Sequence, residues 1–187
     1  MKKIIALSLV LLFSALLFSS CGAKQHTVEI TVENYGVITL TLDESIAPIT
    51  VKNFLKLAED GFYDGLTFHR IIDGFMIQGG DPKGNGTGGS SEKIKGEFAA
   101  NGVKNDLSHK RGVISMARSS AYNSASSQFF IMHKDYPGLD GQYAAFGWVT
   151  SGMEVVDAIC ANTPVTDNNG TVASANQPKI TSVRVID

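Results

Sequence analysis

The sequence predicts a mainly β protein: a closed antiparallel barrel whose open ends are covered by two short α-helices. Many short segments alternate apolar and polar residues, only two stretches show helical spacing, and no internal repeat is present. The 19 glycines among 187 residues suit a loop-rich β fold better than a helical bundle. A formal net charge of -2 provides no strong attraction to nucleic acid, so no nucleic-acid partner is expected.

The N-terminal residues have the composition of a secretory signal peptide. A basic start is followed by residues 4–18, which are almost wholly apolar. This stretch is shorter than a transmembrane helix usually requires. Small residues stand immediately before Cys21, which resembles a bacterial lipoprotein box, where the cysteine thiol receives a diacylglycerol and becomes the new N-terminus. Phe18 departs from the usual Leu or Val of such a box, so ordinary secretion and an uncleaved anchor stay as alternatives.

These features predict three parts of the chain. We expect a lipoprotein-type signal peptide over residues 1–20, a short tether over residues 21–25 and one domain over residues 26–187. The domain would then sit on the extracytoplasmic face of a bacterial membrane, anchored at Cys21, or would be secreted or periplasmic if no lipid is attached. Cys21 and Cys160 do not form a disulfide framework, and Cys160 is expected to be a small packed residue.

The first elements of the domain are two strands and a helix. Residues 27–33 and 38–42 alternate apolar with polar side chains, which predicts two half-buried strands around a turn. Residues 47–61 show helical spacing, with Pro48 suited to the first turn and Gly61 to the end, so they predict the first helix.

The second half of the domain continues the β pattern and adds one helix. A second short helix is expected over residues 152–161, and a polar loop over residues 163–178. Further strands are predicted at residues 112–117, 128–132, 144–149 and 180–185.

Residues 68–81 carry the strongest local signal for a functional site. They read as two short strands joined by a turn at Asp73-Gly74, a favoured hairpin dipeptide. Because side chains alternate along a strand, Phe75 is expected on one face and Met76 and Gln78 on the other. A cation, an amide, a thioether and an aromatic ring thus lie close together, although a half-buried hairpin with its polar residues in solvent is the alternative interpretation.

The sequence does not meet the residue spacing that other kinds of functional site require. The glycines at 84, 86 and 89 formally fit a dinucleotide-binding fingerprint, but more glycines and serines follow where a helix should begin. No Gly-x-Ser-x-Gly elbow accompanies the serines, which disfavours a serine hydrolase. The four histidines show no metal-ligand spacing, so neither a metal site nor a cofactor is expected.

Residues 68–81, FHRIIDGFMIQGGD, closely resemble the signature of the cyclophilin-type peptidyl-prolyl isomerases. The resemblance returns in register at residues 115–118, 127–131 and 139–147, and it covers nearly all of the chain after about His26. It implies an eight-stranded barrel with two capping helices and a monomeric, cofactor-free enzyme that accelerates isomerisation of X-Pro bonds.

The resemblance also implies roles for individual residues. Arg70 would donate toward the prolyl nitrogen, Gln78 would orient Arg70 and the substrate backbone, and Phe75 and Phe130 would line the proline slot; these four are the expected catalytic residues. The expected substrate-binding residues line the slot, the neighbouring pocket and the path of the peptide, and they are Met76, Gly86, Ala117, Arg118, Ser119, Gln128, Leu139 and Tyr143.

Three positions depart from the best-known eukaryotic pattern of this family. Arg118 stands in place of Asn, Tyr143 in place of His, and Gly138 in place of the Trp found in cyclosporin-binding forms. We therefore expect weak cyclosporin binding, whereas isomerase activity need not suffer.

The leading hypothesis is a membrane-tethered, extracytoplasmic prolyl isomerase that acts on proline-containing unfolded or flexible polypeptides and assists protein folding. One alternative is a cyclophilin fold that binds peptides or a partner with little or no turnover. Another is a structural surface lipoprotein that uses the fold only as a scaffold. The intact Arg70, Phe75, Gln78 and Phe130 favour the enzyme.

Overall fold

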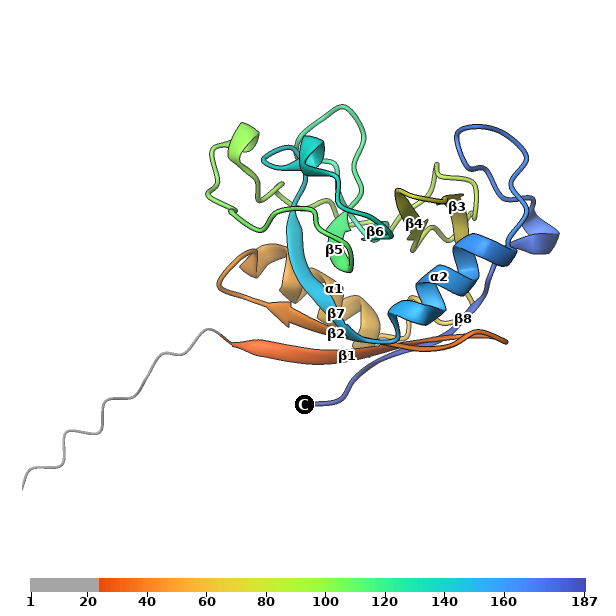
Figure 1. Ribbon diagram of the computed structural model, residues 1–187. Helices are drawn as coiled ribbons and strands as arrows, with labels where there is room; N and C mark the ends of the chain where they lie inside the picture. The colour runs from red at the N-terminus through yellow and green to blue at the C-terminus, as the bar shows by residue number, and fades with distance from the viewer. Residues whose placement is uncertain (1–23) are drawn as a thin grey trace, which may run out of the picture.

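A single antiparallel sheet of eight strands forms the body of the protein. Figure 1 shows the computed structural model, which describes residues 24–187. The strand order is β3-β4-β6-β5-β7-β2-β1-β8. In chain order the strands are β1 (Gln25–Val32), β2 (Gly36–Asp43), β3 (Phe68–Ile72), β4 (Met76–Gly79), β5 (Val113–Met116), β6 (Phe129–Met132), β7 (Ala145–Ser151) and β8 (Ile180–Val185).

The sheet curls so that its two edge strands, β3 and β8, approach each other. Thr67 and Lys179 form an isolated antiparallel bridge across this seam, and the backbone N–H of Phe68 donates to the carbonyl of Pro178 at 2.9 Å. The predicted mainly β fold with eight antiparallel strands and two helices is therefore confirmed. The barrel is less complete than the closed barrel that we expected, because β3 and β8 do not pair along their length. Short segments next to these two strands connect them instead.

Two helices cover the curled sheet. Helix α1 (Pro48–Glu59) packs against β2 and β8, and α2 (Met153–Asn162) packs against β2 and β4 (Figure 1). Both lie where helical spacing predicted them, within a few residues at each end. Phe54 of α1 reaches the centre of the core, where its ring stacks on Tyr63 at a centroid distance of 4.9 Å.

Strand β6 is buried on both faces, which explains its continuous apolar sequence. Phe129 and Ile131 point into the barrel core, whereas Phe130 and Met132 belong to a second apolar cluster. This division follows from the alternation of side chains along a strand. The second cluster lies on the outer face of the sheet and is the floor of the site described below.

Helix α1 receives its N-terminal cap from a distant loop. Residue Ala47 at the N-cap position has no side chain that can accept a hydrogen bond. The buried carboxylate of Glu97 instead accepts the N–H groups of Ile49 at 3.1 Å and Thr50 at 2.8 Å, and the hydroxyl of Thr50 at 2.7 Å. The loop that carries Glu97 is thereby fixed against the helix, since helix N–H groups need such acceptors.

The turn between β3 and β4 differs from the prediction. It contains three residues, because Ile72 pairs with Met76 and the N–H of Phe75 donates to the carbonyl of Ile72 at 3.0 Å. Phe75 therefore lies in the turn and not in the strand. The expectation that it would face away from Met76 is wrong, since both side chains line the same groove.

The expectations about the leader, including Cys21, lie outside the described residues. Among residues 24–187 the longest helix has 12 residues, and no helix is both long and apolar enough to cross a membrane. Strand β1 begins at Gln25, one residue before the expected start of the domain. The predicted polar loop of residues 163–178 contains a short 3₁₀ helix at Ser174–Asn176, and two others lie at Ala99–Asn101 and Pro137–Leu139.

Candidate active site

A groove of about 680 Å³ lies over the outer face of β3, β4 and β6. Ten of the twelve predicted catalytic and substrate-binding residues line it: Arg70, Phe75, Met76, Gln78, Gly86, Ala117, Arg118, Phe130, Leu139 and Tyr143. The other two, Ser119 and Gln128, line a smaller adjoining hollow of about 200 Å³. The structure thus brings together residues that the sequence separates by more than 70 positions.

Strand register places three of the expected catalytic residues in one row. Arg70 on β3 pairs with Gln78 on β4, and Gln78 pairs with Phe130 on β6. Directly paired residues on one face of an antiparallel sheet have neighbouring side chains. A guanidinium, an amide and an aromatic ring therefore lie side by side across the groove.

A chain of amide hydrogen bonds runs from this row to the Gly-rich loop of residues 79–91. Arg70 Nη1 donates to Gln78 Oε1 at 3.3 Å, and Gln78 Nε2 donates to Gln128 Oε1 at 2.9 Å. Gln128 Nε2 then donates to the carbonyls of Gly88 at 2.7 Å and Gly86 at 3.1 Å. Each amide orients the next, so the position of the guanidinium depends on the whole chain.

Arg70 is also held by a loop that sequence reasoning did not assign to the site. Its Nε donates to the carbonyl of Asn169 at 2.8 Å, and its Nη2 donates to Asn169 Oδ1 at 3.1 Å. The loop lies along the free edge of β3, where Ile71 N donates to Gly170 O at 2.8 Å and Arg70 bridges Thr171. Gly170 has a φ of +80°, and a Cβ there would collide with the Ile71 carbonyl, so this close approach requires glycine.

An apolar slot occupies one end of the groove. The rings of Phe130 and Tyr143 meet edge to face with centroids 5.7 Å apart. His109 stacks on Phe130 at 6.0 Å, and its Nδ1 lies 2.9 Å from Asp140 Oδ1. Burial lowers the pKa of His109, with Asp140 opposing that shift, so the ring is neutral at pH 7 and supports Phe130 without adding charge. Phe75 completes the slot from the hairpin turn.

Arg118 turns its side chain back onto the protein. Its guanidinium lies 4.6 Å from the centroid of the Tyr143 ring and 5.1 Å from those of Phe98 and Tyr122, and Nη2 donates to the carbonyl of Gln142 at 2.8 Å. The side chain thus braces the wall of the slot. Such cation–π contacts are typical of arginine.

The Gly-rich loop is organised around one buried carboxylate. Asp81 accepts the backbone N–H groups of Lys83 at 2.8 Å, Asn85 at 3.1 Å and Gly86 at 2.6 Å. Burial acts to raise the pKa of Asp81, but these backbone donors outweigh it and hold the pKa below its ordinary value. As predicted, the segment is a loop and no helix follows it.

His69, next to Arg70 on β3, also lines the groove. It is 4% exposed, and neither ring nitrogen has a protein hydrogen-bond partner. Burial lowers its pKa, and the nearby Arg70 acts in the same direction, while Asp81 opposes them. The ring is therefore neutral at pH 7 and adds no charge beside the guanidinium.

Sequence reasoning missed His69, Asn169 and Thr171 as residues of the groove. The sequence predicted a polar loop over residues 163–178. No signal in the sequence indicated that this loop would lie against β3, because that contact depends on where the sheet closes.

Comparisons with known proteins agree with the observed fold and with the resemblance of the sequence motifs to the cyclophilin-type isomerases. The model of the family described as cyclophilin type peptidyl-prolyl cis-trans isomerase/CLD matches residues 27–185. A peptidyl-prolyl cis-trans isomerase of Helicobacter pylori is 49% identical over 128 residues, which cover 67% of this chain and 76% of that protein. Peptidyl-prolyl cis-trans isomerase B of Bacillus subtilis is 48% identical over 123 residues, covering 66% and 82%.

A solved structure shows the same fold. The crystal structure of a Cryptosporidium parvum cyclophilin type peptidyl-prolyl cis-trans isomerase, determined in the presence of the dipeptide Ala-Pro, has a TM-score of 0.75 and 34% sequence identity. The match covers 86% of this chain and 99% of that one.

Proposed function

From the premise that this chain belongs to the cyclophilin family of peptidyl-prolyl cis-trans isomerases, we propose that it works outside the cytoplasm, tethered to a membrane by a lipid on Cys21. Its substrates are X-Pro bonds, and in this proposal they occur in extracytoplasmic proteins that are unfolded or flexible. The observation that carries the proposed mechanism is the row of Arg70, Gln78 and Phe130 on three adjacent strands, at the edge of an apolar slot.

The reaction needs no nucleophile, because no covalent bond breaks. Amide resonance creates a rotation barrier of about 18–20 kcal/mol, and X-Pro bonds exchange over roughly tens to hundreds of seconds. In the twisted transition state the prolyl nitrogen becomes pyramidal and carries a lone pair. A site that binds this state more tightly than either planar state accelerates the exchange.

The groove offers the parts that such binding requires. In the proposed complex the proline ring enters the slot formed by Phe75, Met76, Phe130 and Tyr143, which excludes water. The guanidinium of Arg70 donates toward the prolyl nitrogen from a position fixed by Gln78 on one side and Asn169 on the other. A charged donor that is positioned before the reaction stabilises the lone pair without reorganisation. The segment 117–119 would pair with the backbone of the peptide.

The tether would keep the domain close to the membrane. Three residues separate Cys21 from the first residue of β1, so an extended chain would span roughly 14 Å at most between them. Diacylglycerol together with a further acyl chain gives stable anchoring, whereas a single chain is marginal. Clients would therefore be met as they emerge at the membrane surface.

The proposal is tested by expressing the full chain and its Cys21→Ala variant in bacteria with a labelled fatty acid. The proposal expects label and isomerase activity in the membrane fraction of the wild type, with both lost from that fraction in the variant. A wild-type protein without label, or with the same distribution as Cys21→Ala, would overturn the lipid anchor. Isomerase activity confined to the cytoplasm would overturn the extracytoplasmic role.

A further inference from the structure

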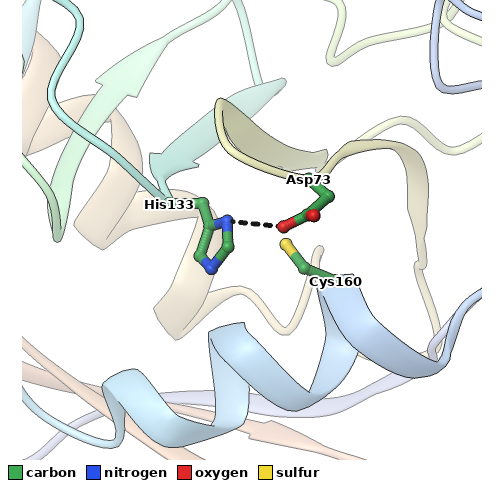
Figure 2. A group of neighbouring side chains, drawn as sticks. All are labelled: Asp73, His133 and Cys160. Atoms are coloured by element: carbon green, nitrogen blue, oxygen red, sulfur yellow. Dashed lines mark ion pairs between the residues drawn. The ribbon is translucent and has the colours of Figure 1, made fainter.

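A cluster of three potential metal ligands lies beside the tip of the β3–β4 hairpin, apart from the residues that line the groove. Asp73 lies in the turn, His133 follows β6 and Cys160 lies on α2, and Figure 2 shows their side chains gathered at one point. One oxygen, one nitrogen and one sulfur atom all lie within 4.8 Å of one another. Three distant segments of the chain thus supply three different donors.

The hydrogen bonds of His133 make Nδ1 its basic nitrogen. Nε2 lies 3.0 Å from Asp157 Oδ1, and Arg111 binds both oxygens of Asp157 at 2.8 Å. Because Arg111 donates to both oxygens of Asp157, this carboxylate is the acceptor for Nε2–H. Nδ1 in turn accepts the backbone N–H of Gly74 at 2.9 Å.

The carboxylate of Asp73 faces the same ring nitrogen. Asp73 Oδ1 lies 3.3 Å from His133 Nδ1, the contact drawn in Figure 2. Both atoms are hydrogen-bond acceptors when the ring is neutral, and two acceptors at this distance repel each other unless a proton or a cation lies between them. The sulfur of Cys160, on a residue that is 8% exposed, closes the third side of this space.

We propose that Asp73, His133 and Cys160 bind a divalent, thiol-seeking metal ion, with Zn²⁺ as the best fit. Zn²⁺ takes carboxylate oxygen and imidazole nitrogen at about 2.0–2.2 Å and thiolate sulfur at about 2.3 Å in a tetrahedral arrangement. Two ligand atoms at about 2.1 Å from a tetrahedral centre are about 3.4 Å apart. The separation of 3.3 Å between Asp73 Oδ1 and His133 Nδ1 therefore matches a shared metal ion.

The surroundings of the cluster also suit a metal site. A histidine that binds metal through one nitrogen usually donates the other N–H to a carboxylate, as His133 does to Asp157. The side chain of Asp73 is 80% exposed, so an ion can enter from solvent, and water can fill the fourth position.

Binding has a defined proton balance. The Cys160 thiol loses its proton to the buffer as the metal–sulfur bond forms, and the metal–nitrogen bond replaces the hydrogen bond from Gly74 to His133. The ion would then join the hairpin turn, the end of β6 and α2. The turn also holds Phe75, whose carbonyl accepts the N–H of His133 at 2.8 Å, so the metal would stiffen the part of the chain that carries one wall of the slot.

The test uses the full chain carrying Cys21→Ser, because Cys160 is then its only thiol. Metal-free protein is titrated with Co²⁺ and then with Zn²⁺, while absorbance, proton release and thermal unfolding are recorded. We expect a saturable thiolate-to-cobalt charge-transfer band, loss of that band as Zn²⁺ displaces Co²⁺, about one proton released from the thiol per ion bound, and a rise in Tm with Zn²⁺.

Two variants and a control locate the site. Cys160→Ser should abolish the charge-transfer band. Asp73→Asn, at an exposed position where folding is not at risk, should weaken Zn²⁺ binding at least tenfold. Asp106→Asn removes another exposed carboxylate, one that pairs with Lys104, and should bind as the parent does. Absence of the band in the parent protein, or equal Zn²⁺ affinity in the parent and Asp73→Asn, would overturn the proposal.

Discussion

Asn169 should act as a positioning residue for Arg70, and replacing it should slow catalysis without unfolding the site. Asn169→Ala removes the bond from Arg70 Nη2 to the side-chain oxygen at 3.1 Å but keeps the bond from Nε to the backbone carbonyl at 2.8 Å. A hydrogen bond to a charged group contributes about 1.5–3 kcal/mol when sheltered, and this one is open to solvent, so we expect a loss of about 1 kcal/mol. That loss corresponds to about a fivefold lower kcat/KM.

A double-mutant cycle tests the reason for that loss. The full chain is assayed for isomerisation of a prolyl peptide as wild type, Asn169→Ala, Arg70→Ala and the double variant. If Asn169 acts through the guanidinium, its replacement has no further effect once Arg70 is gone. Asn176→Ala, in the same loop, serves as the matched control and should be as active as the wild type. An equal loss from Asn169→Ala in both backgrounds would refute the reasoning.

Three further predictions follow from the structure. Glu97→Ala should lower the free energy of unfolding by about 2–3 kcal/mol, because it leaves the buried N–H and hydroxyl of Thr50 without their acceptor. Urea denaturation measures this free energy, and a change below about 0.5 kcal/mol would contradict the capping role. Burial lowers the pKa values of His69 and His109 from 6.5, so protons bind preferentially to the unfolded chain. The free energy of unfolding should therefore decline as pH falls below about 6.5, and a value that stays constant between pH 7 and 5 would argue against this. Cyclosporin should bind weakly because Gly138 offers no indole ring, and calorimetric titration showing affinity similar to that of strongly inhibited cyclophilins would rule this out.

The periodicity of the sequence predicted the first two strands and the first helix of the fold. Alternation in residues 27–33 and 38–42 and helical spacing in residues 47–61 each corresponded to an observed strand or helix. Strand count came from the family resemblance, because short apolar runs such as β5 and β6 are buried on both faces and carry no alternation. The seam between β3 and β8 left no local signal, since its hydrogen bonds join backbone groups more than 100 residues apart.

Some residues of the candidate site could likewise be predicted from the sequence, and others could not. Motif residues such as Arg70 and Gln78 were found because they lie in one contiguous hairpin, and strand pairing then fixed their neighbours. Phe75 was placed on the wrong face because the turn is one residue longer than its Asp-Gly dipeptide suggested. Asn169 was missed because only the closed sheet brings its loop to Arg70.

The cluster of Asp73, His133 and Cys160 could not be found by a search for ligand spacing. Such motifs place ligands a few residues apart on one element, whereas these three lie on a turn, a strand end and a helix. The expectation that no metal site exists rested on sequence spacing alone. Spacing cannot show that Asp73, His133 and Cys160 lie close together in the folded chain.

The most direct test of the account is the isomerase activity of the full chain as wild type and as Arg70→Ala. The slow, proline-limited refolding phase of a substrate protein gives the rate. The account predicts that the wild type accelerates this phase and that Arg70→Ala reduces the acceleration at least tenfold, a loss of about 1.4 kcal/mol or more of transition-state stabilisation. Equal acceleration by the two proteins would contradict the central role of the guanidinium.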